Sequence, residues 1–179
     1  MVISNKKLPD VLKRLVMRML DRLNHVETEL AFVDEEINAQ NKLDDRCKRL
    51  IEILGVGRLA ASAIVASVGN AREFRSGREF SAWLGLVPRQ HSSGGKQNLQ
   101  GMSKKGDAYI RKMLIHGARA VIRHMNRNNA PVEWLESLMK RRHRNVVIVA
   151  LANKLARTAW AVLSREQKYI RFEGTTVVA

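Results

Sequence analysis

Apolar residues in the first part of the chain recur at alternating spacings of four and three positions. The series consists of Leu12, Val16, Met19, Leu23, Val26, Leu30, Val33 and Ile37. A mean spacing of about 3.5 residues keeps one stripe of a helix facing a partner over many turns, so the pattern predicts a coiled-coil arm. Polar Gln40 and Asp44 then fall on the stripe, and we expect a weak point or hinge there. An intramolecular helical hairpin is the alternative.

After residue 50 the pattern predicts a compact helical domain. Ser76 and Asp107 are suitable N-caps, because their side chains can accept hydrogen bonds from the first turn of a helix. The predicted helices cover about residues 59–68, 78–84, 107–125, 131–139 and 146–165. The segment from Pro88 to Gly106 is rich in Ser, Gly, Lys and Gln without helical periodicity, which predicts one long loop. We therefore expect a mainly all-α fold, with an arm at 1–50, a helical domain at 51–169 and a flexible tail at 170–179.

The predicted arm and the rest of the chain differ in net charge. The chain has 32 Lys and Arg against 17 Asp and Glu, a formal net charge of +15. Residues 1–50 hold 10 basic and 9 acidic groups, net +1, which leaves 22 basic and 8 acidic groups, net +14, in residues 51–179. A folded segment this basic favours a polyanion as partner, and nucleic acid over a membrane surface.

Several classes of protein are disfavoured by composition. Without a long apolar run or an apolar N-terminal stretch, the sequence predicts neither a membrane span nor a secretory signal, and we expect a cytoplasmic protein. Cys47 is the single cysteine, so it cannot form an internal disulfide. No Cys/His cluster has the spacing of a zinc site, so the sequence predicts no bound metal and no cofactor in this chain.

Residues 51–69 have the pattern of a helix-hairpin-helix. Gly55 and Gly57 flank Val56 between two apolar segments, and Arg58 follows at once. Glycines let the backbone turn sharply and approach a phosphate, while the start of the next helix offers unpaired N–H groups to an anion. Two interpretations stay open at this point, contact with a nucleic-acid phosphate and a purely structural turn.

The predicted helix at 107–125 carries a basic face. Lys112, Arg119 and Arg123 lie on one side with His116 between them, and Arg111 adjoins Lys112. A row of cations at helical spacing can follow a phosphate backbone and contribute affinity without base specificity. A solvated amphipathic face is the alternative.

The polar loop is a second candidate site. Ser92 and Ser93 precede two glycines and Lys96, and Lys104 and Lys105 follow at the end of the loop. The residues suit a backbone nest that grips phosphate, or a serine nucleophile held by such a nest. His91 is a candidate base by sequence proximity, and Arg89 adds a further cation.

Three stretches together resemble the C-terminal domain of the insertion-sequence transposases of the group numbered 110, 116 and 902. They are GVGRLAASAIVASVG at 55–69, FRSGREFSAWLGLVPRQHSSGGK at 74–96 and SKKGDAYIRKMLIHGARA at 103–120. The resemblance extends over about residues 51–163. It implies that the family's nucleophilic serine corresponds to Ser93, with Ser92 as the adjacent fallback. It also implies DNA as partner and a structured guide RNA as a possible second partner.

The resemblance includes one departure. Family members also have a RuvC-like domain whose four carboxylates bind divalent metal, whereas the acids of residues 1–50 fall on a heptad helix. We expect magnesium only together with that missing domain, and expect this chain alone to be inactive. The resemblance thus implies the DNA-binding, serine-bearing portion of a transposase, and the heptad pattern predicts that it assembles as a homo-oligomer through its arm. A non-catalytic nucleic-acid-binding and oligomerisation module is the alternative.

Overall fold

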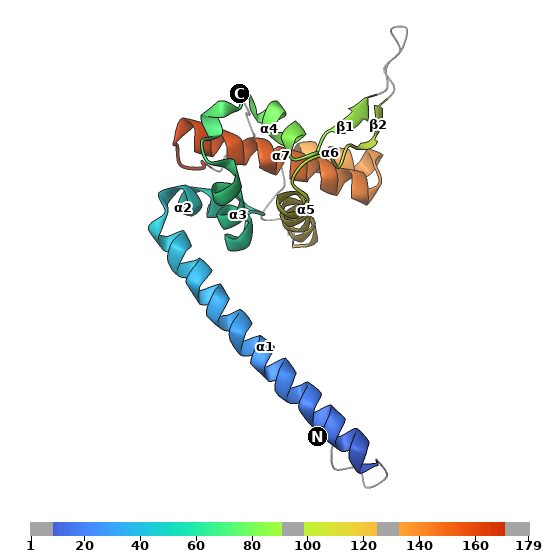
Figure 1. Cartoon of the computed structure of the whole chain (residues 1–179). Coiled ribbons are helices and arrows are strands. Elements are labelled where there is room, and N and C mark those ends of the chain that lie inside the picture. The colour runs from blue at the N-terminus through green and yellow to red at the C-terminus, as the bar shows by residue number, and fades with distance from the viewer. Residues whose placement is uncertain (1–8, 91–98, 125–132, 171–179) are drawn as a thin grey trace. The chain divides into compact units, whose positions relative to one another are not determined.

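The computed structural model describes residues 9–90, 99–124 and 133–170 (Figure 1). The helices are α1 (Asp10–Leu43), α2 (Asp45–Ile51), α3 (Arg58–Val68), the short 3-10 helix η1 (Ala71–Glu73), α4 (Gly77–Trp83), α5 (Ala108–Arg123), α6 (Glu133–Arg141) and α7 (Arg144–Arg165). Two short strands, β1 (Pro88–Gln90) and β2 (Leu99–Met102), form an antiparallel pair. The prediction of a mainly helical fold that begins with one long helix is confirmed.

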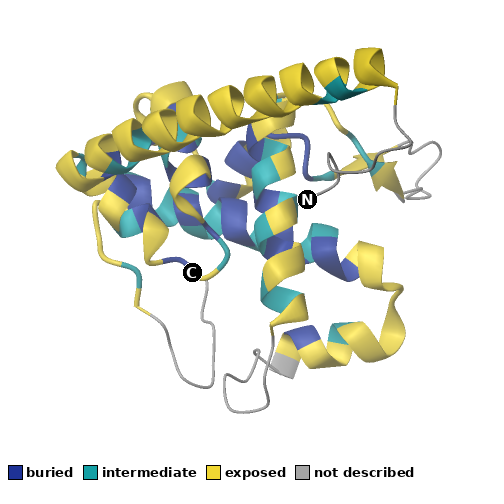
Figure 2. Ribbon diagram, turned by 90° about the horizontal axis from the view of Figure 1, so that it is seen from below, coloured by how far each residue is buried: buried dark blue, intermediate teal, exposed yellow. Residues whose placement is uncertain are grey.

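Residues up to Gln40 form a unit of their own, which contains α1 except for its last three residues. Figure 2 shows that this helix is exposed over nearly its whole length. Two members of the predicted stripe, Val16 and Ile37, are half-buried. The others are exposed, namely Leu12, Met19, Leu23, Val26, Leu30 and Val33. The stripe is therefore a continuous apolar surface along a single helix.

The long helix ends where the sequence placed a weak point. Leu43 is its last residue, and Asp44 then caps α2 by accepting a hydrogen bond from the backbone N–H of Arg46 at 2.8 Å. The second unit already begins at Asn41, because Asn41, Cys47 and Leu50 are buried in it. Residues 41–50 thus fold with the helical unit, whereas the sequence pattern had assigned them to the arm.

The core of the second unit is built around α7. This helix buries nine residues and packs against α5, α4, α2 and α6 (Figures 1 and 2). Its buried residues are Val147, Ile148, Leu151, Ala152, Leu155, Ala156, Ala159, Val162 and Leu163. By length and mean hydropathy α7 would also suit a membrane span, but a row of side chains buried among other helices is what a core helix shows.

Local signals placed the ends of several helices correctly. Ser76 Oγ accepts from the N–H of Glu79 at the start of α4, and Asp107 Oδ1 accepts from the N–H of Ile110 at the start of α5. Gly69, with φ of 58°, ends α3. The caps thus act as the sequence predicted, since each satisfies backbone groups that the helix leaves unpaired.

One expectation needs correction. The polar segment 88–106 is not loop throughout, because β1 and β2 pair at its two ends. Two tryptophans, Trp83 and Trp134, lie at the edge of the core and are each 38% exposed. Trp83 packs one side against Phe74 and Phe80, and Trp134 lies under the ammonium group of Lys154, with Nζ 4.7 Å from the ring centre.

Candidate nucleic-acid interface

The basic face of α5 is fully open in the described part of the molecule. Ile110, Leu114 and Ala118 are buried on the opposite side of the helix. The predicted cations and the histidine between them are all exposed, namely Lys112, His116, Arg119 and Arg123. The amphipathic division of α5 therefore orients this row away from the core.

The cations of this face are not paired with carboxylates in the part of the chain that the structure describes. Lys112, Arg119 and Arg123 take part in no ion pair there. The Lys112 ammonium group lies 5.4 Å from the centre of the Tyr109 ring, which leaves its charge uncompensated. A row of exposed and unpaired cations attracts a polyanion more strongly than one neutralised by carboxylates.

The two glycines of the glycine turn, between α2 and α3, have different surroundings and different roles. Gly55 adopts φ of 97° and packs inward, where an added Cβ would meet Val121 and Leu155 at 2.9 and 3.0 Å. Gly57 is exposed, with no atom within 4 Å of an added Cβ, and it occupies the N-cap of α3 without a side chain to cap the helix. The backbone can therefore be approached from solvent at Gly57, while Gly55 supports the turn.

Arg58 begins α3 beside this open backbone. It is exposed and has no ion-pair partner in the parts of the chain that the structure describes. The first N–H groups of a helix have no intrahelical acceptor, so they and the guanidinium offer hydrogen bonds to an anion at the same end of α3.

The antiparallel pair of strands β1 and β2, called the hairpin below, is held at its base by close backbone contacts. Gly85 and Lys105 approach so closely that a Cβ on Gly85 would lie 2.0 Å from the carbonyl oxygen of Lys105. Lys104 has a positive φ of 57°, and its N–H donates to the carbonyl of Gly85 at 3.1 Å. The side chains of Lys104 and Lys105 are exposed, so both charges face solvent beside the hairpin.

Arg111 has different surroundings from its neighbour Lys112. Its Nη1 donates to the carbonyl oxygen of Leu84 at 3.0 Å and to that of Gly106 at 3.3 Å. A third carbonyl, that of Asp107, lies 3.4 Å away. The guanidinium thus joins the end of α4 to the start of α5, and it is half-buried there instead of standing on the open basic face.

Four loop residues singled out by the sequence lie outside the described residues. They are His91, Ser92, Ser93 and Lys96. Arg89, at the edge of the same segment, is exposed on β1. The structure fixes the two strands that begin and end this segment, together with their attachment to α4.

Residues 47–133 match the family model described as "Transposase IS116/IS110/IS902 family". This segment belongs to that transposase family. The transposase domain so defined runs from α2 to the start of α6, and includes the glycine turn, the hairpin and α5. The match overlaps the segment 51–163 in which the sequence shows the resemblance, so the resemblance is confirmed. Positions 92 and 93, the two serines, fall within it.

Relatives extend the similarity to most of the chain. The "Probable family 20 transposase" of Pseudomonas aeruginosa is 51% identical over 163 residues, which are 90% of this chain and 48% of the relative. The "Transposase for insertion sequence element IS1111A" of Coxiella burnetii is 43% identical over 88% of this chain and 44% of its own length. The transposase of element IS1328 of Yersinia enterocolitica is 36% identical over 89% and 48%. The chain spans about half the length of these curated relatives.

The described acidic side chains of the transposase domain do not come together as a metal site. Within the described ranges, no three side chains of His, Cys, Asp and Glu lie together in a way that could hold a metal ion. Asp44 and Asp45, the acids nearest the start of the domain, are paired with Arg46 and Lys48. The described residues therefore do not fit a magnesium centre.

A basic cluster between α6 and α7 was missing from the predicted site residues. It lies just beyond the transposase domain and consists of Lys140, Arg141, Arg142, His143 and Arg144, all of them exposed. His143 caps α7, its Nδ1 accepting from the N–H of Asn145 at 3.2 Å. The basic run is visible in the sequence, directly after the predicted helix at 131–139.

Proposed function

We propose that this chain is the DNA-binding, serine-bearing portion of an insertion-sequence transposase, acting on phosphodiester bonds in concert with a carboxylate domain. The family match at residues 47–133 carries the proposal, because it includes Ser93 and the hairpin strands around it. The names of the relatives, which are called transposases, support it. The reaction would take place in the cytoplasm, where the element's DNA lies.

The open face of α5 would bind the DNA backbone. Lys112, Arg119 and Arg123 are exposed and unpaired, so each can displace counterions from phosphates. Lys104 and Lys105 would extend the positive surface to the hairpin, where Ser93 is attached. Such contacts position the duplex without reading its sequence, which leaves target choice to other groups, a structured guide RNA among them.

The glycine turn would supply a second backbone contact, of the helix-hairpin-helix kind. Gly57 leaves the first amides of α3 accessible, and Arg58 adds a formal charge beside them. Gly55 would serve this contact indirectly by keeping the turn in place.

Ser93 would be the nucleophile, with Ser92 as the fallback. Its Oγ would form a bond to phosphorus while the bond from phosphorus to the leaving DNA oxygen breaks, and the serine proton would pass to a base. Arg89 and Lys96 are of the right type to neutralise the phosphate during this step. A serine hydroxyl is a weak nucleophile at its ordinary pKa, which is why the proposal assigns activity to the chain only together with a carboxylate domain.

The long helix α1 would join copies of the chain. Its apolar stripe is exposed and has the heptad spacing of a coiled coil. Transposition has to bring DNA segments together, and a homo-oligomer provides more than one binding face.

The DNA-binding step is tested by measuring affinity for labelled duplex DNA and structured RNA across a salt series. The Arg119→Ala/Arg123→Ala protein should show a smaller salt slope, by about two, whereas Ser93→Ala should bind as the unaltered chain does. Binding that is absent, or unchanged by salt and by the arginine substitutions, would contradict the proposed role of α5.

The chemical step needs a separate experiment. The chain would be combined with the carboxylate domain of a family relative and supplied with donor and target DNA, and strand cleavage would be followed on a gel. Ser93→Ala should abolish cleavage while Ser92→Ala retains it. A Ser93→Ala protein that still exchanges strands would overturn the assignment.

A second function also has support. The exposed apolar stripe of α1 and the exposed cations of α5 suit self-association and nucleic-acid binding by themselves. A non-catalytic nucleic-acid-binding scaffold would need neither the serine nor a metal. The scaffold function would be supported if the chain bound DNA and self-associated but gave no strand cleavage with any carboxylate domain.

A further inference from the structure

A pocket of about 380 Å³ lies at the end of α3, opposite the end that carries the glycine turn. α3 has 11 residues, so the two ends are separated by roughly 16 Å, the rise of a helix of that length. Val65, Val68 and Leu163 form an apolar wall of the pocket. Its charged residues are Arg46, Arg49, Arg72 and Glu166.

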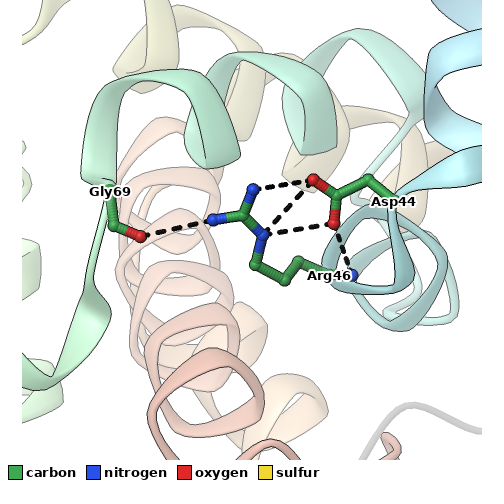
Figure 3. Close-up of polar contacts among 3 residues, drawn as sticks. All are labelled: Asp44, Arg46 and Gly69. Atoms are coloured by element: carbon green, nitrogen blue, oxygen red, sulfur yellow. Dashed lines mark hydrogen bonds and ion pairs between the residues drawn. The ribbon is translucent and has the colours of Figure 1, made fainter.

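Two of the three arginines are held by protein partners. Arg46 Nη2 lies 2.8 Å from Asp44 Oδ2, and its Nη1 reaches the carbonyl oxygen of Gly69 at 3.5 Å (Figure 3). Arg72 Nη2 lies 2.8 Å from Glu166 Oε1, and its Nε donates to the carbonyl of Ser164 at 3.2 Å. These arginines are thereby fixed at the rim, and their carboxylate partners are already engaged.

Arg49 has no such partner. Its Nε is buried, and among the described residues it donates no hydrogen bond and takes part in no ion pair. A buried donor on a charged group is costly when it is left unsatisfied, and native structures supply a partner in the great majority of cases. The Nη groups of Arg49 are not buried in this way and have no partner among the described residues either, so they are the donors that a ligand in the pocket can reach.

The charges and the shape together define the ligand. Asp44 pairs with Arg46, Glu166 with Arg72 and the neighbouring Asp45 with Lys48, so among the described residues the guanidinium of Arg49 has no ion-pair partner of its own. A guanidinium matches an oxyanion, and phosphate in particular, through parallel N–H donors. The volume leaves room beside a phosphate for the sugar attached to it, which the apolar wall would contact. We propose that this pocket is a phosphate-binding site in which Arg49 is the principal ligand.

The phosphate could belong to a nucleic-acid backbone or to a free nucleotide, and the chemistry at Arg49 is the same in both. The site is distinct from the basic face of α5 and from the glycine turn. It therefore does not depend on the proposed function, and phosphate binding can be measured without any DNA.

The first test is a titration of the whole chain with inorganic phosphate, followed by ¹⁵N NMR of the arginine Nε–Hε resonances, against sodium chloride at matched ionic strength. The Arg49 resonance should shift and saturate with phosphate only. Arg49→Gln should weaken binding about tenfold, as expected for the loss of one charge-assisted hydrogen bond. Arg49→Lys keeps the charge but lacks the parallel N–H donors of a guanidinium, and should also bind more weakly. Arg78→Gln, an exposed arginine of α4 outside the pocket, is the matched control and should bind as before.

Thermal unfolding separates a ligand site from a structural role. In phosphate-free buffer Arg49→Gln should be as stable as the unaltered chain or more so, since it removes an unsatisfied donor. Added phosphate should raise the Tm of the unaltered chain and of Arg78→Gln, but not of Arg49→Gln. A lower Tm of Arg49→Gln in phosphate-free buffer, or a phosphate effect equal in all variants, would overturn the proposal.

A third arm identifies the source of the phosphate. If Arg49→Gln lowers duplex DNA affinity and reduces its salt slope by about one, the site takes a backbone phosphate. If a 5′-mononucleotide competes with inorganic phosphate while duplex affinity stays unchanged, the site takes a free nucleotide. Loss of DNA binding in the α5 variants leaves the phosphate titration unaffected, so the two proposals fail independently.

Discussion

Gly117 in α5 packs directly against the backbone of Gly55 in the glycine turn. A Cβ placed on Gly117 would fall 1.8 Å from the carbonyl oxygen of Gly55. Two elements distant in the sequence, the turn before α3 and the middle of α5, thus meet backbone to backbone. Because α5 bears the basic face and the turn bears Gly57 and Arg58, this contact fixes the two candidate phosphate-binding elements within one unit.

Gly117→Ala is therefore expected to destabilise the fold. The added methyl group has to displace backbone, which we expect to cost about 3 kcal/mol and lower the Tm by roughly 9 °C. Gly57→Ser is the control, because space around Gly57 is open and its φ of −84° suits a serine that could cap α3. Thermal unfolding of both variants checks the prediction, and equal Tm values for the two would refute the close contact.

The distinction between these glycines shows how far local sequence signals reach. The pattern at 51–69 correctly placed a turn between two helices, because glycine and helix-end signals are local. It could not assign different roles to Gly55 and Gly57. The difference arises from Gly117, which is remote in sequence and comes close only when α5 packs.

The contrast between local signals and contacts from distant elements also explains the other differences between the sequence-based predictions and the structure. Ser76 and Asp107 were recognised as caps, since a cap is satisfied within its own turn. Arg111 was grouped with Lys112 on the basic face, yet the carbonyl groups that hold it come from α4 and from the start of α5. The strands β1 and β2 are too short to show an alternating pattern, and Arg49 gave no signal at all until α2, α3 and α7 enclosed a pocket.

Substitutions of the adjacent residues Arg111 and Lys112 should have different effects, on the stability of the fold and on DNA binding respectively. Arg111→Gln loses the bonds to the carbonyls of Leu84 and Gly106, and we expect unfolding free energy to fall by about 1–2 kcal/mol. Lys112→Gln removes an exposed charge and should change stability by less than about 0.5 kcal/mol, while lowering the salt slope of DNA binding by about one. Urea unfolding and a salt series on both proteins measure this. The reverse result, a stable Arg111→Gln protein with a reduced salt slope, would return Arg111 to the binding face.

The cap of α2 should make stability depend on pH. The hydrogen bond from the Arg46 side chain is the largest cause that lowers the pKa of Asp44 from its usual 3.8. A carboxylate with a lowered pKa contributes stability that is fully present above the unfolded value, and that stability is lost as pH falls through the folded value. Asp44→Asn keeps a capping oxygen but no charge, so it should be less stable than the unaltered chain at pH 7 and approach it in stability below about pH 3.

Asp44→Ala tests the cap itself. It should lose about 1 kcal/mol more than the asparagine variant at neutral pH, because the N–H of Arg46 then has no side-chain acceptor. Urea unfolding at pH 7 and pH 3 gives both comparisons. A difference between Asp44→Asn and the unaltered chain that stays constant with pH would show that the ion pair with Arg46 contributes nothing measurable.

The exposed stripe of α1 predicts self-association that can be abolished by charge. Leu23 and Leu30 occupy equivalent heptad positions and are both exposed in the single chain. Each leucine buried in a coiled coil contributes about 2 kcal/mol, so Leu23→Glu/Leu30→Glu should weaken association by at least about a thousandfold. His25→Glu/Thr28→Glu adds the same charge at positions off the stripe, and should associate as the unaltered chain does. Sedimentation equilibrium between about 1 and 100 µM provides the measurement. If the unaltered chain were monomeric throughout that range, the stripe would have to be covered by something other than a second copy.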